Sequence, residues 1–248
     1  MKVFYIDYKK VWQYTLLLFL AIIIGIVFYH YLTEPVIKPQ ITDFYPVYKV
    51  ETEKKIIALT FDLSWGTTTY KPILETLKAE NIKATFFLSG PWAKTHPEIV
   101  REIVKGGHEI GSHGHRHVNY SSLSAEEIRK EVRLAQDSIQ NVSGITTTLI
   151  RLPNGDYNKE VIKTLREIGY TAIQWSVDSL DWKNPGGEII FKRVTTKIHP
   201  GAIILMHASD TCKQTGQVLP KIIKELKRQG YSFTTVSNLL TLGPAAIQ

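Results

Sequence analysis

Short apolar runs alternate with amphipathic segments along most of the chain. Seven of these runs are continuous and rich in β-branched residues, which is typical of strands buried on both faces of a parallel sheet. They lie near 55–61, 84–88, 107–111, 147–151, 171–177, 202–206 and 231–235. The segments between them repeat their apolar residues at helical spacing, near 70–80, 97–105, 124–141, 158–168, 187–198 and 217–229. The alternation predicts βα units and favours an incomplete α/β barrel over an open sheet.

Several predicted strands end in a residue that can take part in chemistry. In parallel α/β folds, active sites gather at the carboxyl ends of the strands. The pattern therefore predicts one shared pocket and an enzyme. The residues at these ends are Asp62, His113 with His117 four positions later, Arg151, Asp178 and His207.

Each of these residues also has a purely structural interpretation. Asp62 could cap a turn, Arg151 could form a structural ion pair, and His207 could be a satisfied core histidine. His113 and His117 can bind one divalent ion if they lie on a helical turn, whereas on a strand they would be about 13 Å apart. The metal hypothesis therefore predicts that the chain turns helical after the strand that precedes His113.

The first forty residues differ from the rest of the chain. No formally charged side chain occurs from Val11 to Thr33, which is long enough to span a bilayer as a helix. Lysines precede this run, so the positive-inside rule predicts a cytoplasmic N-terminus and a domain outside the membrane. A cleaved signal peptide is the alternative, but no small-residue cleavage site follows the run. The expected regions are a cytoplasmic tail (1–10), a transmembrane anchor (11–33), a proline-containing linker (34–52), the catalytic domain (53–241) and a C-terminal tail (242–248).

Charge and cysteine content narrow the possible partners. The formal net charge is +7, but the basic residues are scattered and form no stripe interleaved with aromatic residues. We therefore expect no nucleic-acid partner, and an anionic envelope polymer fits better. The chain has one cysteine, Cys212, so it forms no internal disulfide. The sequence does not indicate an oligomeric state.

Five ordered segments give the chain a family resemblance, which covers about residues 53–241. They are Thr60-Phe61-Asp62, His113 with His117, Arg151-Leu152-Pro153-Asn154-Gly155, Asp178-Ser179-Leu180-Asp181-Trp182 and Leu205-Met206-His207. Together they resemble the motifs of polysaccharide deacetylases, the NodB homology domain. Trp65-Gly66 and the N-terminal anchor are similar to the sporulation-associated, membrane-anchored branch. The resemblance implies a distorted, incomplete (β/α)7 barrel of the NodB type.

The resemblance also implies a reaction, the metal-dependent hydrolysis of N-acetyl groups from amino sugars of peptidoglycan or a related cell-wall or spore glycan. A divalent metal, typically zinc, would be held by His113 and His117. Asp62 would be the general base, oriented by Arg151, and His207 the general acid, fixed by Asp178. The sugar would contact Trp182, Tyr157, Trp65 and Asp181.

One position departs from the family pattern. The first motif of the family normally has two adjacent aspartates, and the second binds the metal, but this chain has Leu63 there. Zinc sites usually have three protein ligands, so the resemblance implies weak metal retention and reduced activity. Water, Asp62 or Ser64 would fill the remaining positions. The alternative hypothesis is therefore a catalytically weak or inactive homologue that binds envelope glycan.

Overall fold

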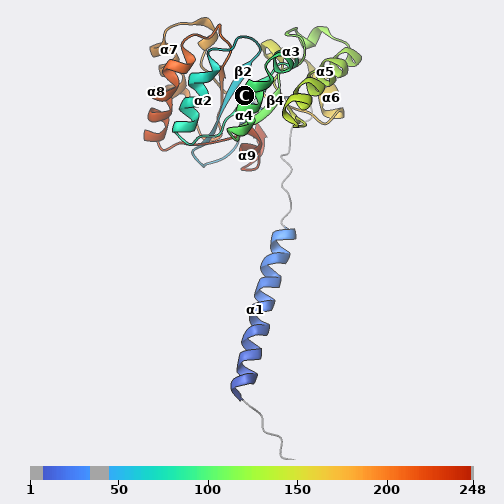
Figure 1. Cartoon of the computed structure of the whole chain (residues 1–248), viewed down its shortest axis with the longest axis vertical. Helices are drawn as coiled ribbons and strands as arrows, with labels where there is room; N and C mark the ends of the chain where they lie inside the picture. The colour runs from blue at the N-terminus through green and yellow to red at the C-terminus, as the bar shows by residue number, and fades with distance from the viewer. Residues whose placement is uncertain (1–7, 34–44, 247–248) are drawn as a thin grey trace, which may run out of the picture. The chain divides into compact units, whose positions relative to one another are not determined.

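The computed structural model describes residues 8–33 and 45–246, and it separates the chain into two compact units (Figure 1). The first unit, Met1–Lys38, contains the helix α1 (Tyr8–Thr33), and the second unit, Pro39–Gln248, contains the other described elements. A helix therefore forms where the anchor was expected. Among the residues described, however, no helix combines the length and the apolar character that crossing a membrane requires.

The second unit is built on a parallel sheet that opens on one side, an α/β half-barrel. The strand order is β6-β5-β4-β3-β2-β8-β7, and β9 pairs with the first residues of β2. The strands are β2 (Ile56–Leu63), β3 (Thr85–Leu88), β4 (Glu109–Ser112), β5 (Leu149–Ile150), β6 (Thr171–Ala172), β7 (Val177–Asp178), β8 (Ile203–His207) and β9 (Ser232–Thr234). The predicted incomplete barrel is thus confirmed.

Helices cover the outer face of this sheet. Figure 1 shows α2, α7 and α8 gathered at one side of β2 and α5 and α6 at the other. The helices are α2 (Tyr70–Ala79), α3 (Gly90–Thr95), α4 (Pro97–Lys105), α5 (Ala125–Ser143), α6 (Lys159–Glu167), α7 (Gly187–Lys197), α8 (Thr215–Arg228) and α9 (Val236–Leu240). A capping box formed by Ser124 and Glu127 starts α5, and Gly144 ends it with a left-handed backbone.

The alternation of side chains along β2 divides the core in two. Leu59, Phe61 and Leu63 belong to the large apolar cluster beneath the helices. Ala58 belongs to a second cluster, which also contains residues of α9. Thr60 and Asp62 follow Ala58 on the same face, because successive side chains of a strand point to opposite faces. Asp62 is therefore presented at the carboxyl end of the inner face.

The predicted segment boundaries need three corrections. The run 171–177 is two short strands, β6 and β7, because the chain between them leaves the sheet. The compact unit extends beyond 53–241 at both ends, since β1 (Lys49–Val50) pairs with β10 (Ala245–Ala246). Val47 and Lys49 also bridge to Ile173 and Ala202, so part of the expected linker contributes to the sheet. Residues 34–44 of that linker lie outside the described residues.

Candidate active site

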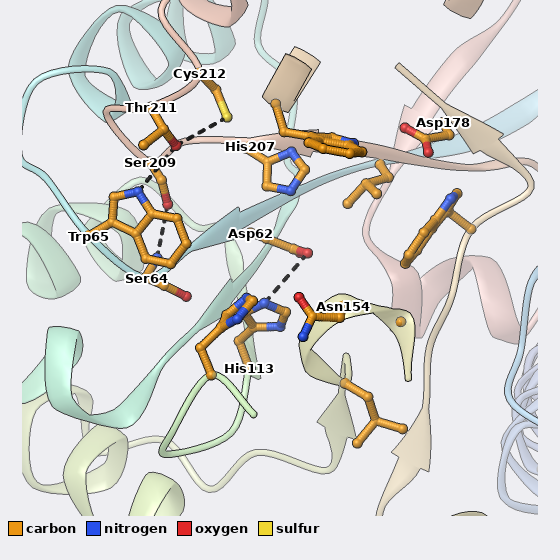
Figure 2. A pocket seen from close by; sticks show the side chains of 16 residues that line it. Asp62, Ser64, Trp65, His113, Asn154, Asp178, His207, Ser209, Thr211 and Cys212 are labelled. Atoms are coloured by element: carbon orange, nitrogen blue, oxygen red, sulfur yellow. Dashed lines mark hydrogen bonds and ion pairs between the residues drawn. The ribbon is translucent and has the colours of Figure 1, made fainter. Parts of the chain in front are cut away.

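A pocket of about 480 Å³ opens at the carboxyl ends of the strands (Figure 2). Its size suits one or two sugar rings, because small-molecule sites typically occupy about 300–1,000 Å³. Five of the six residues predicted at strand ends line this pocket, and the sixth, Arg151, lies directly behind it. The wall is formed by Asp62, Ser64, Trp65, His113, His117, Leu152, Asn154, Gly155, Trp175, Asp178, Trp182, Leu205, His207, Ser209, Thr211 and Cys212.

Asp62 is the buried carboxylate at the floor of this pocket. It is directly opposite His207 in the parallel pairing of β2 with β8. Arg151 donates a hydrogen bond of 2.9 Å from its Nη1 to Asp62 Oδ1. Burial alone would raise the pKa of Asp62, but the positive charge of Arg151 and the hydrogen bond that it donates bring the pKa below its ordinary value. The carboxylate is therefore ionised at neutral pH, as a general base must be.

Arg151 is fully buried behind Asp62 and is fixed from several directions. Its guanidinium also donates to Thr60 Oγ1 at 2.7 Å and to the Gln174 carbonyl at 3.0 Å, and it lies 4.4 Å from the ring centroid of Phe87. With its donors occupied in this way, the guanidinium holds one carboxylate oxygen of Asp62 and leaves the other directed to the pocket. The orienting role expected for Arg151 agrees with this geometry.

His207 is held by Asp181. The Nδ1 atom of His207 lies 2.7 Å from Asp181 Oδ1, and its backbone N–H donates to Asp181 Oδ2 at 2.7 Å. The hydroxyl of Thr215 donates to the same Oδ2 at 2.6 Å. Burial would lower the pKa of His207, but the hydrogen bond and charge of Asp181 outweigh it and raise the pKa above its ordinary value. The Nε2 atom of the imidazole therefore faces the pocket. The raised pKa favours the protonated form of the ring.

The expectation that Asp178 fixes His207 is wrong. The 3₁₀ helix η3 (Asp181–Lys183) brings Asp181, not Asp178, behind His207. Asp178 instead accepts a hydrogen bond of 2.8 Å from the backbone N–H of Leu180, and Figure 2 shows it apart from His207 in the pocket wall. The expected substrate contact of Asp181 is also wrong, because its side chain is fully buried. The two aspartates of this motif thus exchange their predicted places.

This exchange predicts a shift in the titration of His207. In Asp181→Asn, the loss of the carboxylate charge leaves burial to dominate, so the pKa of His207 should fall. His207 would then lose its proton at a lower pH, and any activity that needs the imidazolium would decline at a correspondingly lower pH. An NMR titration of the His207 ring measures this directly. Asp178→Asn is the matched control and should leave the titration in place, so a shift in the control alone would contradict the assignment.

His113 and His117 meet, but not on a helix. The segment that follows β4 is irregular, and Gly114 has φ +75° in the left-handed region. A Cβ at Gly114 would lie 2.5 Å from the hydroxyl of Tyr120, so the turn requires glycine. The two imidazole rings are 5.5 Å apart between centroids, and His113 Nε2 lies 3.8 Å from Asp62 Oδ2. The predicted helical turn is wrong, although the predicted convergence is confirmed.

The two imidazoles suit a divalent cation. His113 Nδ1 lies 2.8 Å from the Arg151 carbonyl, an arrangement that orients a metal-binding histidine and leaves Nε2 available. Burial lowers the pKa of His113 to about 4, and it also lowers the pKa of His117. Both rings are therefore neutral at physiological pH, as metal ligands must be.

The third ligand is the weak point of this cation site. Leu63 is fully buried in the apolar cluster beneath the helices and does not line the pocket. The adjacent Ser64 does line it, and its hydroxyl is buried without a hydrogen-bond partner. The donor set thus fits a divalent ion through two neutral imidazoles and one orphaned hydroxyl. A site with so few protein ligands and no acidic one should hold the ion weakly.

Aromatic side chains form the rim of the pocket. Trp65 and Trp182 are 43% and 50% exposed, and both line it as expected for sugar contacts. Tyr157 does not line the pocket, because its hydroxyl bonds to that of Tyr48 at 3.0 Å. Trp175 and Asn154 line the pocket and were not predicted. Trp175 stood within an apolar run, where an aromatic residue is more often part of the core.

Asp210 joins the two loops that carry much of this wall. Its carboxylate accepts hydrogen bonds from the backbone N–H groups of Thr67, Thr68 and Thr69 at 3.0, 2.8 and 2.8 Å. Gly66 has φ +84°, and a Cβ there would lie 2.2 Å from Asp210 Cγ. The same two loops are joined where Trp65 Nε1 donates to Thr211 Oγ1 at 3.1 Å. Asp210 therefore fixes the loop that presents Trp65.

Asp210→Ala should weaken glycan binding without unfolding the protein. Without Asp210, the loop that presents Trp65 is no longer fixed and must be ordered when the glycan binds. Ordering one side chain costs about 0.5–1.5 kcal/mol of binding free energy, so affinity should fall about two- to tenfold. Calorimetry with an N-acetylglucosamine oligomer measures the change. Glu127→Ala is the control, because it removes a carboxylate that accepts a backbone N–H from the capping box of α5, away from the pocket. Equal losses in both variants would show that Asp210 has no specific role.

The fold and the site define a class: an α/β half-barrel that places an oriented carboxylate opposite an oriented imidazole in an aromatic-rimmed pocket. A family model described as polysaccharide deacetylase matches residues 49–173, and the chain belongs to this family. A peptidoglycan-N-acetylglucosamine deacetylase of Bacillus cereus is 37% identical over 199 residues, which are 79% of this chain and 93% of that one. The uncharacterized protein YlxY of Bacillus subtilis is 33% identical over 79% of this chain, and the match spans only 60% of YlxY.

Among solved structures, a similar one is BA3943 of Bacillus anthracis, described as a CE4 family pseudoenzyme. It is 35% identical, with a TM-score of 0.76 over 81% of this chain and 70% of that chain. A mutant of the same protein, also with a TM-score of 0.76, is described as having restored enzymatic activity. The family thus includes both deacetylases and a pseudoenzyme on this fold, and the choice between them depends on the residues of each site.

Proposed function

We propose that this chain hydrolyses the N-acetyl groups of amino sugars in peptidoglycan, with N-acetylglucosamine as the residue attacked. The observation that carries the proposal is the pair formed by Asp62 and His207. Each is fixed from behind by a charged partner, Arg151 or Asp181, and both belong to one pocket. A protein that only binds glycan has no need for two such oriented groups with opposite protonation tendencies. The similarity to the peptidoglycan-N-acetylglucosamine deacetylase of Bacillus cereus supports the choice of substrate.

The chemistry follows from what each group can do with a proton. Asp62 is ionised and would take a proton from the water that attacks the amide carbonyl. His207 Nε2 would give its proton to the sugar nitrogen as the carbon–nitrogen bond breaks, which releases acetate and a free amine. Trp65 and Trp182 would stack on the apolar faces of sugar rings at the rim. A divalent ion such as zinc, held by His113 and His117, would supply Lewis acidity at the carbonyl.

The substrate determines where such an enzyme works. We propose that the domain acts outside the cytoplasmic membrane, on glycan of the cell wall or of the spore envelope. The scattered net charge of +7 suits an anionic polymer of this kind. Protease added to intact protoplasts should degrade the domain if this location is right, and it should leave a cytoplasmic control protein intact.

A second candidate function rests on one observation, the burial of Leu63 in the core. Without an acidic third ligand, the chain could bind envelope glycan and cleave it very slowly. The similarity to BA3943 supports this alternative, since that protein is described as a pseudoenzyme.

Acetate release decides between the two functions. The full chain is incubated with N-acetylglucosamine oligomers and with purified peptidoglycan, with and without added zinc or cobalt. Metal-dependent acetate release supports the hydrolase, and release from muramic acid residues only would change the sugar assigned. Glycan binding without acetate, equal in wild type and His113→Ala, would show a metal-independent binder and overturn the hydrolase proposal.

A further inference from the structure

We infer that the chain has a second cation site, formed by Asp181, His207 and Cys212, that takes zinc or another thiophilic divalent ion. Among the described residues, these three form the group of histidine, cysteine and acidic side chains that is close enough to hold one ion. One ligand atom from each lies within 4.8 Å of the other two. Figure 2 shows the sulfur of Cys212 on the same side of the pocket as His207.

The donor types suit zinc better than those of the His113–His117 pair. One carboxylate, one imidazole and one thiolate would neutralise the charge of a Zn²⁺ ion and supply three protein ligands, with a fourth position left for water. Ligand atoms around tetrahedral zinc are about 3.3–3.8 Å apart, given metal–ligand bonds of about 2.0–2.3 Å. No separation in the group exceeds 4.8 Å, so the ligand atoms must approach one another by about 1 Å at most. If Asp181 Oδ1 and His207 Nδ1 both bind the ion, their 2.7 Å hydrogen bond must open to this spacing. By contrast, the His113–His117 pair has beside it the hydroxyl of Ser64 and the Asp62 carboxylate, which is already bonded to Arg151.

The surroundings of the three residues would support an ion. Asp181 and Cys212 are almost completely buried, and the Thr215 hydroxyl already orients the Asp181 carboxylate. Hydrogen bonds of this kind from outside the ligand set raise metal affinity. Burial and the nearby Asp181 charge raise the pKa of the Cys212 thiol to about 12. The thiol therefore stays protonated until a cation binds, and binding would release that proton to solvent.

The inferred site would make zinc an inhibitor as well as an activator. A cation at this position would bind a ring nitrogen of His207 and the Asp181 carboxylate that holds the ring. A ring nitrogen bound to a metal carries no proton and cannot donate one to the substrate. Zinc that occupies this site should therefore slow acetate release. This consequence rests on the proposed hydrolase function, whereas the site itself does not.

Cobalt substitution tests the site without any need for activity. The reduced full chain, kept in a mild detergent, is titrated with Co²⁺ alone. Because Cys212 is the single cysteine of the chain, a sulfur-to-cobalt charge-transfer band in the near ultraviolet can come only from this residue. We expect the band in wild type and in His113→Ala with His117→Ala, where it should saturate at about one cobalt per chain. We expect no band in Cys212→Ser, with circular dichroism to confirm that this variant is folded.

A second measurement on wild type removes any dependence on the variants. Zinc should protect the single thiol from a small alkylating reagent, and a chelator should reverse the protection. Cobalt binding without the band, or an alkylation rate that zinc does not change, would overturn the inference. Neither result depends on acetate release, so failure of the second site and failure of the proposed hydrolysis are distinguishable.

Discussion

Asp62→Asn should reduce acetate release by about a hundredfold or more, because a positioned general base contributes roughly 10²–10⁴ to the rate. The amide keeps the size of the carboxylate and can still accept the hydrogen bond from Arg151, but it cannot take a proton from water. Binding of N-acetylglucosamine oligomers should persist, since the aromatic rim and the rest of the wall are unchanged. The measurement is steady-state acetate release beside calorimetric glycan binding.

The substitution also removes a negative charge next to a buried guanidinium, so lost stability must be separated from lost chemistry. Breaking a buried ion pair can cost about 3–5 kcal/mol of unfolding free energy, although the amide should retain part of the interaction. Glu131→Gln is a matched control. Glu131 is a nearly buried carboxylate that bonds to Arg116 at 2.6 Å, and it does not line the pocket. This control should lose stability but keep its acetate release, and equal loss of activity in both variants would refute the base assignment.

The pattern of apolar residues was sufficient to predict the fold, because burial determines where apolar residues occur along the chain. Each predicted strand occurs near its expected position, since continuous β-branched runs have no stable place except inside a covered parallel sheet. The missed elements are short. Both α3 and α9 have too few residues to show a helical period, and β1 and β10 are two-residue strands that depend on each other. Tertiary pairing, which no local pattern records, creates these elements.

The sequence was sufficient to predict which residues at the strand ends form the site, but not which residues hold them in place. Asp62, Arg151 and His207 follow from the rule that parallel strands present their last residues at one edge. The partner of His207 could not be chosen by that rule, because Asp178 and Asp181 are only three residues apart. Leu180, with φ +55°, begins the turn that puts Asp181 behind the ring. Backbone conformations of this kind are selected by the packing of the whole loop.

The neighbouring Leu63 shows how the two faces of one strand constrain the chemistry. Because Asp62 faces the pocket, the residue after it in β2 faces the helices, and an apolar side chain fits there. An acid at position 63 would have to turn out of the core toward the imidazoles. Such a turn is favourable only if a cation is present to bind the carboxylate. Stability and metal binding at this position are therefore coupled.

Leu63→Asp should accordingly make folding depend on metal. Without a cation, the buried carboxylate and the lost packing should lower the free energy of unfolding by about 2–5 kcal/mol, the range for removing a buried leucine side chain. With zinc, a third ligand beside His113 and His117 should raise metal affinity at least about tenfold. Residues that merely orient ligands already change affinity by about 10–100-fold. Thermal unfolding with and without zinc measures both effects.

The effect of Leu63→Asp on the site at His113 and His117 must be measured apart from any other cation site. All variants are made in a Cys212→Ser background, so that only the cation site at His113 and His117 contributes. Leu63→Asn is the matched control, because it introduces similar polarity and size without an anionic ligand. We expect both variants to be destabilised when free of metal, and only Leu63→Asp to regain stability with zinc and to release more acetate than its parent. If zinc stabilises Leu63→Asp no more than Leu63→Asn, the missing acid at position 63 is not what limits this site.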